Sequence, residues 1–256
     1  MRRLVILVMA ATLLAGCAPQ AIRRTFDVGE HRVSMAARPE WRFVEQGRRL
    51  LMRHGQVGLA LEDLGPRGRA GIRAEIERAR TLWRGGQDRE ARTRMTMIPV
   101  PEVLFAAPEQ RRAFWETWHE VSGAPEGLDP TLVEGRFDRL LDAVETLRER
   151  PADELVDDAL LEMGEDERRS VASRSRRTVG GRGVIVVVTW NRLSHDGARR
   201  FAFVDHDGRI LVLRTGAVAG TLAGAADDRA FESVLESLRI EPAAAQSVAG
   251  GRRSIT

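Results

Sequence analysis

Two amino acids are absent from this chain, and a third occurs once. There is no lysine and no tyrosine, and Cys17 is the single cysteine. Without lysine the chain has no Schiff-base amine, no P-loop lysine and no Ser-Lys dyad, and without tyrosine it has no phenolic acid. One cysteine cannot form an internal disulfide, so the fold must rest on its core alone.

The charge balance excludes a further class of protein. All 40 Lys+Arg positions are arginine, they face 37 acids, and the formal net charge is +3. Loss of Arg2 and Arg3 with a cleaved leader would lower that charge by two. The isoelectric point is high only because almost nothing titrates between histidine and arginine. We therefore expect no nucleic acid partner.

The N-terminus is typical of an export signal. Arg2 and Arg3 precede an uncharged stretch, residues 4–14, in which Thr12 is the only polar residue. Small residues follow, and a charged start, a short apolar run and small residues are the marks of a secretory signal. The run is shorter than the roughly 20 residues that span a bilayer. The sequence therefore predicts a signal peptide over residues 1–16.

The end of this signal, Leu14-Ala15-Gly16-Cys17, resembles the lipobox of bacterial lipoproteins. In that class the chain is cut before the cysteine, which then carries palmitate-type acyl chains that anchor the protein stably to a membrane. The alternative is a secreted protein in which Cys17 has no such role. Ala18 in place of aspartate favours the outer over the inner membrane by resemblance to bacterial sorting rules. The resemblance thus implies a protein held on the cell envelope through Cys17 and facing the periplasm.

Removing residues 1–16 from a chain of 256 leaves 240 residues, enough for one large domain. After a tether over residues 17–25, alternation at 31–36 and short strand candidates at 42–45, 49–54 and 57–62, separated by glycine turns, predict an antiparallel meander. Apolar residues at helical spacing predict a helix over 70–84. A further strand is expected over 95–98, before two prolines.

Residues 107–164 are predicted to be helical and to form an insertion packed on the sheet. Asp129-Pro130 is an N-cap followed by proline at the first helical position. An apolar stripe runs from Leu132 to Leu147, and a stripe of that width must be covered. Pro151 separates this helix from a shorter one that ends at residue 163.

The C-terminal part returns to strand periodicity. Residues 183–190 are nearly all apolar, which predicts a central strand with Val184, Val186 and Val188 on one face and Ile185 and Val187 on the other, both covered. A hairpin over 199–214 and a last helix from Asp227 follow. We therefore expect a single α+β domain over 26–241, with an antiparallel sheet packed on helices and a helical insertion at about 107–164. Residues 242–256 are expected to be a disordered tail.

This order of elements resembles the fold shared by PsbP of photosystem II, the Mog-type Ran-binding proteins and the DcrB-like lipoproteins. The resemblance lies in Pro39 and Trp41, in Thr178-Val179-Gly180-Gly181 before the long strand, and in the closing helix. It covers 26–64 and 178–241, and the helices at 107–164 depart from it. Members of this PsbP-like fold are mostly accessory or assembly proteins, so the resemblance implies no catalytic residue.

No motif predicts a catalytic, cofactor or metal site. His119-Glu120 lacks the second histidine of a zincin, and His195-Asp196 lies about 30 Å along one strand from Asp205-His206-Asp207. The chain has no Gly-x-Ser-x-Gly motif. Gly180 to Gly183 precedes a strand rather than a helix, which favours a turn over a phosphate loop.

Two further features have alternative interpretations. Trp115 and Trp118 share a helix face, which favours an aromatic core stripe over a partner surface or a membrane contact. Residues 152–167 hold eight acids, and residues 168–182 hold six arginines. These blocks can pair with each other or form a solvated face, and the alternative is that the arginines dock on an anionic bilayer.

The sequence as a whole favours a non-catalytic envelope lipoprotein that binds or scaffolds a protein partner. The alternative is a carrier or sensor of an apolar or lipid ligand, and an envelope hydrolase is less favoured because no motif supports it. A scaffold should expose an apolar patch, a carrier should enclose an apolar cavity, and an enzyme should bring serine, histidine and carboxylates together in a cleft.

Overall fold

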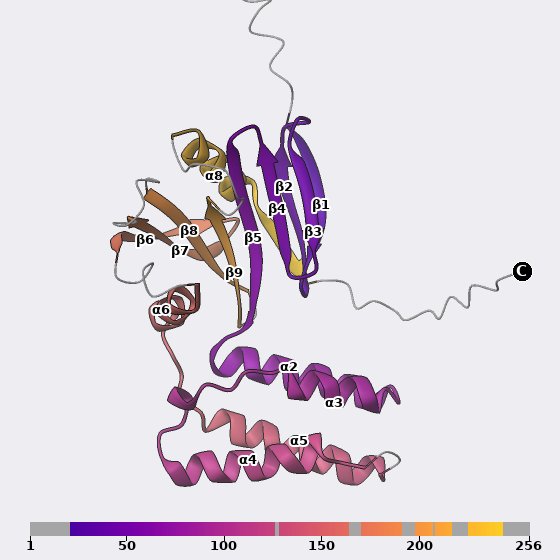
Figure 1. The fold of residues 1–256 in the computed structure, drawn as a ribbon. Coiled ribbons are helices and arrows are strands. Elements are labelled where there is room, and N and C mark those ends of the chain that lie inside the picture. The colour runs from indigo at the N-terminus through magenta and orange to yellow at the C-terminus, as the bar shows by residue number, and fades with distance from the viewer. Residues whose placement is uncertain are drawn as a thin grey trace, which may run out of the picture.

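The computed structural model describes residues 21–125, 128–163, 170–190, 198–206, 208–216 and 225–242. These residues form an antiparallel sheet of three strands, a second one of seven strands, and a central segment of helices. The α+β class predicted from the sequence is confirmed. Figure 1 shows the two sheets at one end of the molecule and most of the central helices at the other.

The N-terminal part forms the expected meander with one additional strand at its start. Its strands are β1 (Ile22–Val28), β2 (His31–Ala37), β3 (Arg42–Gln46), β4 (Arg49–His54) and β5 (Val57–Pro66). β1 pairs with β2 along its whole length. Residues 22–25, which we expected in a tether, therefore belong to the sheet.

The C-terminal part completes both sheets. Its strands are β6 (Val171–Val179), β7 (Arg182–Trp190), β8 (Ala198–His206), β9 (Arg209–Thr215) and β10 (Arg239–Pro242). The larger sheet has the order β3-β4-β5-β9-β8-β7-β6, and the smaller one has the order β1-β2-β10. The hairpin of β8 and β9 confirms the prediction, whereas β6 and β10 were not expected. β6 was not predicted because five of its nine residues are arginine or serine at consecutive positions, Ser173 to Arg177.

β7 has the two covered faces that its apolar run predicted. Val184 and Val186 lie in the core between the two sheets, and Ile185 and Val187 contact the opposite core. Val188 is only half-buried. The strand is internal, but it lies next to the edge strand β6 rather than at the centre of the sheet.

Two helices cover the C-terminal half of the larger sheet. α8 (Ala225–Ser237) packs Phe231 and Leu235 into the core between the sheets. α6 (Ala152–Met163) packs Val156 and Leu160 on the other face, over β7, β8 and β9. Both faces of these strands are therefore removed from solvent, as a near-continuous apolar sequence requires.

The remaining helices form a bundle with its own core. They are α2 (Gly68–Arg84), α3 (Asp88–Thr96), the short 3-10 helix η2 (Glu102–Leu104), α4 (Pro108–Ser122) and α5 (Pro130–Glu145). Asp129 caps α5 as predicted, since its side chain accepts a hydrogen bond from the backbone N–H of Thr131 at 2.8 Å. The strand expected over 95–98 is wrong, because residues 95 and 96 end α3.

The apolar stripe of α5 is covered by helices rather than by the sheet. Val133, Phe137, Leu140 and Val144 are fully buried against residues of α2, α3 and α4. We expected the whole block 107–164 to pack on the sheet, but only α6 does so. The helical segment also begins at Gly68, well before residue 107. The bundle is thus built from parts of both predicted helical regions together with α3, which was not predicted.

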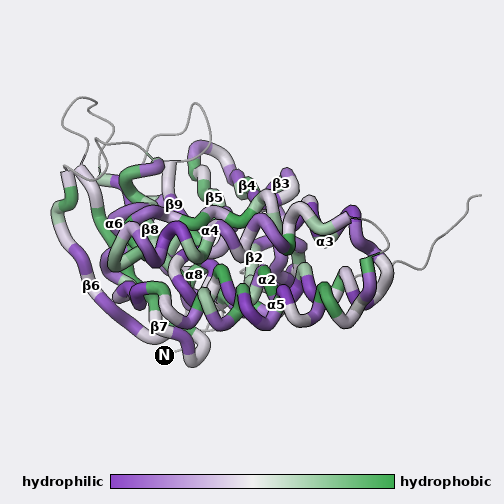
Figure 2. The backbone as a smooth tube through the Cα atoms, turned by 90° about the horizontal axis from the view of Figure 1, so that it is seen from below, coloured by the Kyte–Doolittle hydropathy of each residue, from purple (hydrophilic) through white to green (hydrophobic). Residues whose placement is uncertain are grey.

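A contact between two glycines joins the bundle to the sheet. A Cβ atom at Gly71 of α2 would lie 2.1 Å from the carbonyl oxygen of Gly208, in the β8–β9 turn. Beside it, the backbone N–H of Arg67 donates to the same oxygen at 2.9 Å. Figure 2, seen from the bundle side, shows polar and apolar residues interleaved along these helices. No helix of the described ranges is long and apolar enough to cross a membrane.

Candidate binding cleft and buried ion network

Several residues of interest in the sequence lie outside the described part of the chain. These are Cys17, His195, Asp196 and Asp207. The lipid anchor therefore stays a prediction. Over the described ranges, no group of three or more His, Cys, Asp or Glu side chains could hold a metal ion.

The glycines before β7 form a turn and not a phosphate loop. Gly180 and Gly181 connect β6 to β7 with φ angles of +58° and +81°. These angles lie in the left-handed region that glycine tolerates best. The element that follows is a strand, as the sequence predicted.

The aromatic stripe of α4 faces the bundle core. Phe114 is 1% exposed and Trp118 5% exposed, and Trp115 packs against the same cluster. The prediction of a core stripe is confirmed. His119 and Glu120 follow on the exposed side, where Glu120 forms an ion pair with an arginine of α5.

Two arginines of the basic block pair with acids of the neighbouring acidic block, as one interpretation of the sequence predicted. Three arginines of β6 form ion pairs with neighbouring helices: Arg174 with Asp153 and Asp157 of α6, Arg176 with Asp153, and Arg177 with Glu232 of α8. These guanidinium groups are engaged within the molecule, and the alternative of docking on an anionic bilayer stays untested.

An open cleft of about 600 Å³ lies where the sheets meet the bundle. Its walls come from the β1–β2 and β3–β4 turns, the ends of β5 and β9, and the facing sides of α2 and α3. Half of its fourteen lining residues are charged: Glu30, Arg48, Glu75, Arg89, Glu90, Arg94 and Arg209. Apolar surface comes from Pro66, Leu82, Met97 and Ile98. The cleft therefore presents charges of both signs beside an apolar wall.

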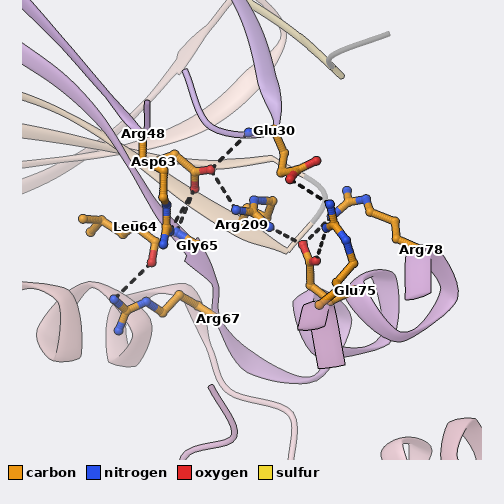
Figure 3. A network of polar contacts seen from close by, with 10 residues as sticks. Glu30, Arg48, Asp63, Leu64, Gly65, Arg67, Glu75, Arg78 and Arg209 are labelled. Atoms are coloured by element: carbon orange, nitrogen blue, oxygen red, sulfur yellow. Dashed lines mark hydrogen bonds and ion pairs between the residues drawn. The ribbon is translucent and has the colours of Figure 1, made fainter. Parts of the chain in front are cut away.

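A buried arginine forms the base of this cleft. Arg209, the first residue of β9, donates to Asp63 of β5 at 2.8 Å and to Glu75 of α2. The exposed fractions of the three side chains are 6%, 0% and 5%. Figure 3 shows Arg209 between the two carboxylates. One guanidinium thus joins both parts of the molecule, and removing one partner of such a pair costs about 3–5 kcal/mol.

The hydrogen bonds of Asp63 keep this carboxylate ionised. Burial alone would raise its pKa, but the hydrogen bond and the charge of Arg209 outweigh burial. The backbone N–H of Gly65 also donates to it, at 2.7 Å. The pKa of Asp63 is therefore held below its ordinary value.

A second layer of charges surrounds Glu75. Arg94 of α3 donates to Glu75 at 2.6 Å and to Glu30 of the β1–β2 turn at 3.0 Å. Arg78 donates to Glu75 from the next turn of α2. Burial opposes ionisation of Arg94, yet Glu30 and Glu75 outweigh it and raise the pKa of its guanidinium. The β1–β2 turn, α2 and α3 are thereby linked through one carboxylate.

Behind the network lies a buried pair of imidazole rings. His31 and His206 are 1% and 2% exposed, and their ring centroids are 4.9 Å apart in an edge-to-face arrangement. Neither ring nitrogen of His31 has a hydrogen-bond partner among the described residues. Burial lowers the pKa of His31 to about 4, with His206 and Arg209 acting in the same direction and Asp63 opposing. His31 is therefore neutral near pH 7.

The lining of the cleft contains few nucleophilic side chains. Among its lining residues the only hydroxyl belongs to Thr93, which donates to the carbonyl oxygen of Arg89 at 2.9 Å. The inner carboxylates are engaged by arginines, and the two histidines do not line the cleft. The lining residues thus present no serine or cysteine nucleophile beside a base.

This network was not predicted from the sequence, although two acidic residues on buried faces indicate it. Glu75 lies between Ile72 and Ile76 on the buried face of α2, and Asp63 is a buried acid between Glu62 and Leu64 of β5. A carboxylate on a buried face requires a cationic partner. The partner itself was not identifiable, because Arg209 is 146 residues from Asp63 along the chain.

Comparisons with known proteins add no function to this geometry. No protein-family model matches the chain, and no curated protein matches it at a significant level. The resemblance to the PsbP, Mog-type and DcrB-like fold stays a prediction.

Proposed function

We propose that this protein is a lipid-anchored envelope protein that binds a segment of a protein partner in the cleft between its sheets and its helical bundle. The role is non-catalytic. The observation that carries the proposal is the cleft itself, which is open and lined by four arginines, three glutamates and a short apolar wall.

The lining favours a peptide over the alternative ligand, an apolar or lipid molecule. A carrier of acyl chains needs an enclosed, mostly apolar cavity, because a charged wall would lose its hydration against the chain. A peptide segment offers backbone amides, carbonyl groups and side chains of either charge. Glu90 and Arg89 are exposed at the mouth, and Met97 is 74% exposed beside them. Such a mixed rim suits a polar segment with an apolar anchor.

Crosslinking from Thr93 tests the cleft. Thr93 lines it, and Thr117 of α4 is a matched control, since both are helical threonines whose hydroxyl groups donate to the carbonyl four residues earlier. A photoreactive phenylalanine derivative at position 93 should give a discrete adduct in cells, and the adduct should be lost when Glu90 is changed to arginine. Equal adducts from positions 93 and 117 would show that the cleft is not the binding site.

The anchor is tested separately with Cys17→Ser. We expect this variant to take up no palmitate analogue and to leave the membrane fraction, because the described chain has no helix that could span a bilayer. An unlabelled variant that stays fully membrane-bound would contradict the anchor, without bearing on the cleft.

A further inference from the structure

The outer face of β3 and β4 is open to solvent. α6 covers this same face over β7, β8 and β9. On β3, by contrast, Val44 is 50% exposed, and its cross-strand neighbour Leu51 is half-buried. Two apolar side chains therefore lie side by side on an accessible surface.

Two arginines border this apolar pair. Arg42 and Arg53 are exposed and lie directly opposite each other across β3 and β4. Like charges in that position repel and destabilise a sheet. Among the described residues, no carboxylate pairs with either guanidinium, and Arg53 donates only to the carbonyl oxygen of Gly55, at 3.3 Å. The repulsion is therefore uncompensated within the described molecule, which indicates an anionic partner.

A third arginine on this face has an acidic partner, but the net charge of the face is still positive. Arg49 lies one row further along β4 and pairs with Glu62 of β5 at 2.7 Å. Glu62 also lies 3.6 Å from Arg214 of β9. One carboxylate is thus shared by two arginines, and the net charge of the face stays positive.

The position of this surface matches the place where the chain would leave a membrane. Ile22, the first residue of β1, pairs with Ala37, and Arg42 follows after a short turn. Figure 1 shows this end of the sheets pointing away from the bundle. The five residues from Cys17 to Ile22 span at most about 18 Å, and stacked sheets lie about 10 Å apart. A lipid on Cys17 would therefore hold Arg42 and Arg53 within reach of the bilayer.

We propose that the surface formed by Arg42, Val44, Leu51 and Arg53 docks on an anionic lipid bilayer. The inference rests on the proposed lipid anchor at Cys17. The arginines are attracted to phosphate headgroups, and Val44 and Leu51 enter the interfacial layer. In that orientation the bundle and the cleft point away from the membrane, where a partner can reach them.

An environment-sensitive dye at position 44 reports on docking. The acylated full chain with Val44→Cys is labelled with nitrobenzoxadiazole, since Cys17 is the only other cysteine. The protein is placed in vesicles of phosphatidylcholine with or without phosphatidylglycerol. Emission should rise several-fold with phosphatidylglycerol only. The same dye at Leu132→Cys of α5, where leucine is 57% exposed, should not respond.

Removing the two charges tests the surface, and a pair of arginines on α4 provides the matched control. Arg42→Gln with Arg53→Gln should lower the ratio of docked to undocked protein about 30-fold, at about 5-fold for each arginine near an anionic surface. Arg111→Gln with Arg112→Gln removes the same charge from α4 and should not change this ratio.

Mass spectrometry of Cys17 decides the anchor independently of the dye. If Cys17 is acylated and the dye at position 44 responds equally to both vesicle types, the docking surface is wrong while the anchor stands. Crosslinking of position 44 to a protein in cells, without a response to phosphatidylglycerol, would likewise overturn the assignment to a bilayer.

Discussion

The sheets and the helical bundle bury their cores in different ways. The bundle core is contributed by residues between Ile72 and Leu147, one continuous stretch of chain. The core between the sheets joins Val28 near the start of the described chain to Ile240 near its end. The bundle thus depends on contacts that are local in sequence, and the sheets depend on contacts between distant segments.

This difference gives the junction between the two parts its importance. At the Gly71–Gly208 contact and around Arg209, α2 meets the turn and the strand that follow β8. A part with local contacts can form early, whereas distant strands must first close long loops. The network at the junction therefore couples a locally built part to one whose parts come from both ends of the chain.

The largest effect is expected from Val186→Asp in β7. Val186 is 2% exposed and lies in the core between the sheets, where a carboxylate would have no partner. We expect a loss of at least about 4 kcal/mol in the free energy of unfolding, measured by urea denaturation. Val44→Asp, at a position 50% exposed, should cost no more than about 0.5 kcal/mol. Similar midpoints for wild type and Val186→Asp would show that this strand is not part of the core.

Phe137→Ala should weaken the bundle selectively. Phe137 is fully buried among the helices, and such truncations cost about 3–5 kcal/mol. Hydrogen exchange should accelerate in α2 to α5 and change little in β7 to β9. Leu132→Ala, at an exposed position of the same helix, is the control. If hydrogen exchange accelerated equally in the bundle and in the sheets, both parts would unfold as one cooperative unit.

Acid should destabilise the junction in two separate steps. The pKa of His31 is about 4 in the folded chain and 6.5 without the fold, so the unfolded state binds the proton first as pH falls. The contribution of neutral His31 to the free energy of unfolding is fully present above pH 6.5. About 3 kcal/mol of it is lost as the pH falls to 4. Asp63, whose pKa is lowered from 3.8, adds a further loss only below that value.

Unfolding free energies measured between pH 7 and pH 3 distinguish these two steps. His31→Gln should abolish the decline between pH 6.5 and 4 and leave the loss at lower pH, because glutamine does not titrate. An unchanged decline in this variant would assign the first step to another group.

The smallest effect is expected from Gly71→Ala. Alanine normally favours a helix, but here its Cβ would lie 2.1 Å from a backbone oxygen of the sheet. We expect a loss of about 1–3 kcal/mol from overpacking, seen as a lower melting temperature. Gly135→Ala in α5 is the control, since nothing lies within 4 Å of its Cβ, and it should stabilise by up to about 1 kcal/mol. Equal gains in melting temperature from the two substitutions would show that the junction is loosely packed.

Several elements followed from local patterns alone. The apolar run of β7, the Gly208 turn between β8 and β9, and the Asp129 cap of α5 each depend on neighbouring residues, and each lies where it was expected. β6 and α3 were missed because their arginine-rich sequences have no clear apolar periodicity. Ion pairs hold each of them to the helix that precedes it in the chain, Arg174 to Asp157 of α6 and Arg94 to Glu75 of α2, and a search for apolar periodicity does not detect such pairs.

By itself the sequence determined the α+β class, the two-sided burial of β7, the aromatic core of α4 and the lack of lysine, tyrosine and disulfide chemistry. These features depend on composition or on a period of a few residues, and both can be read directly from the sequence. Only the tertiary structure decided that Asp63, Glu75 and Arg209 meet at the base of a cleft and that Arg42 and Arg53 lie opposite each other. Glu75 and Arg209 are 134 residues apart along the chain, and no local pattern encodes that distance. Their meeting requires that a helix of the bundle and a strand of the sheet first pack against one another.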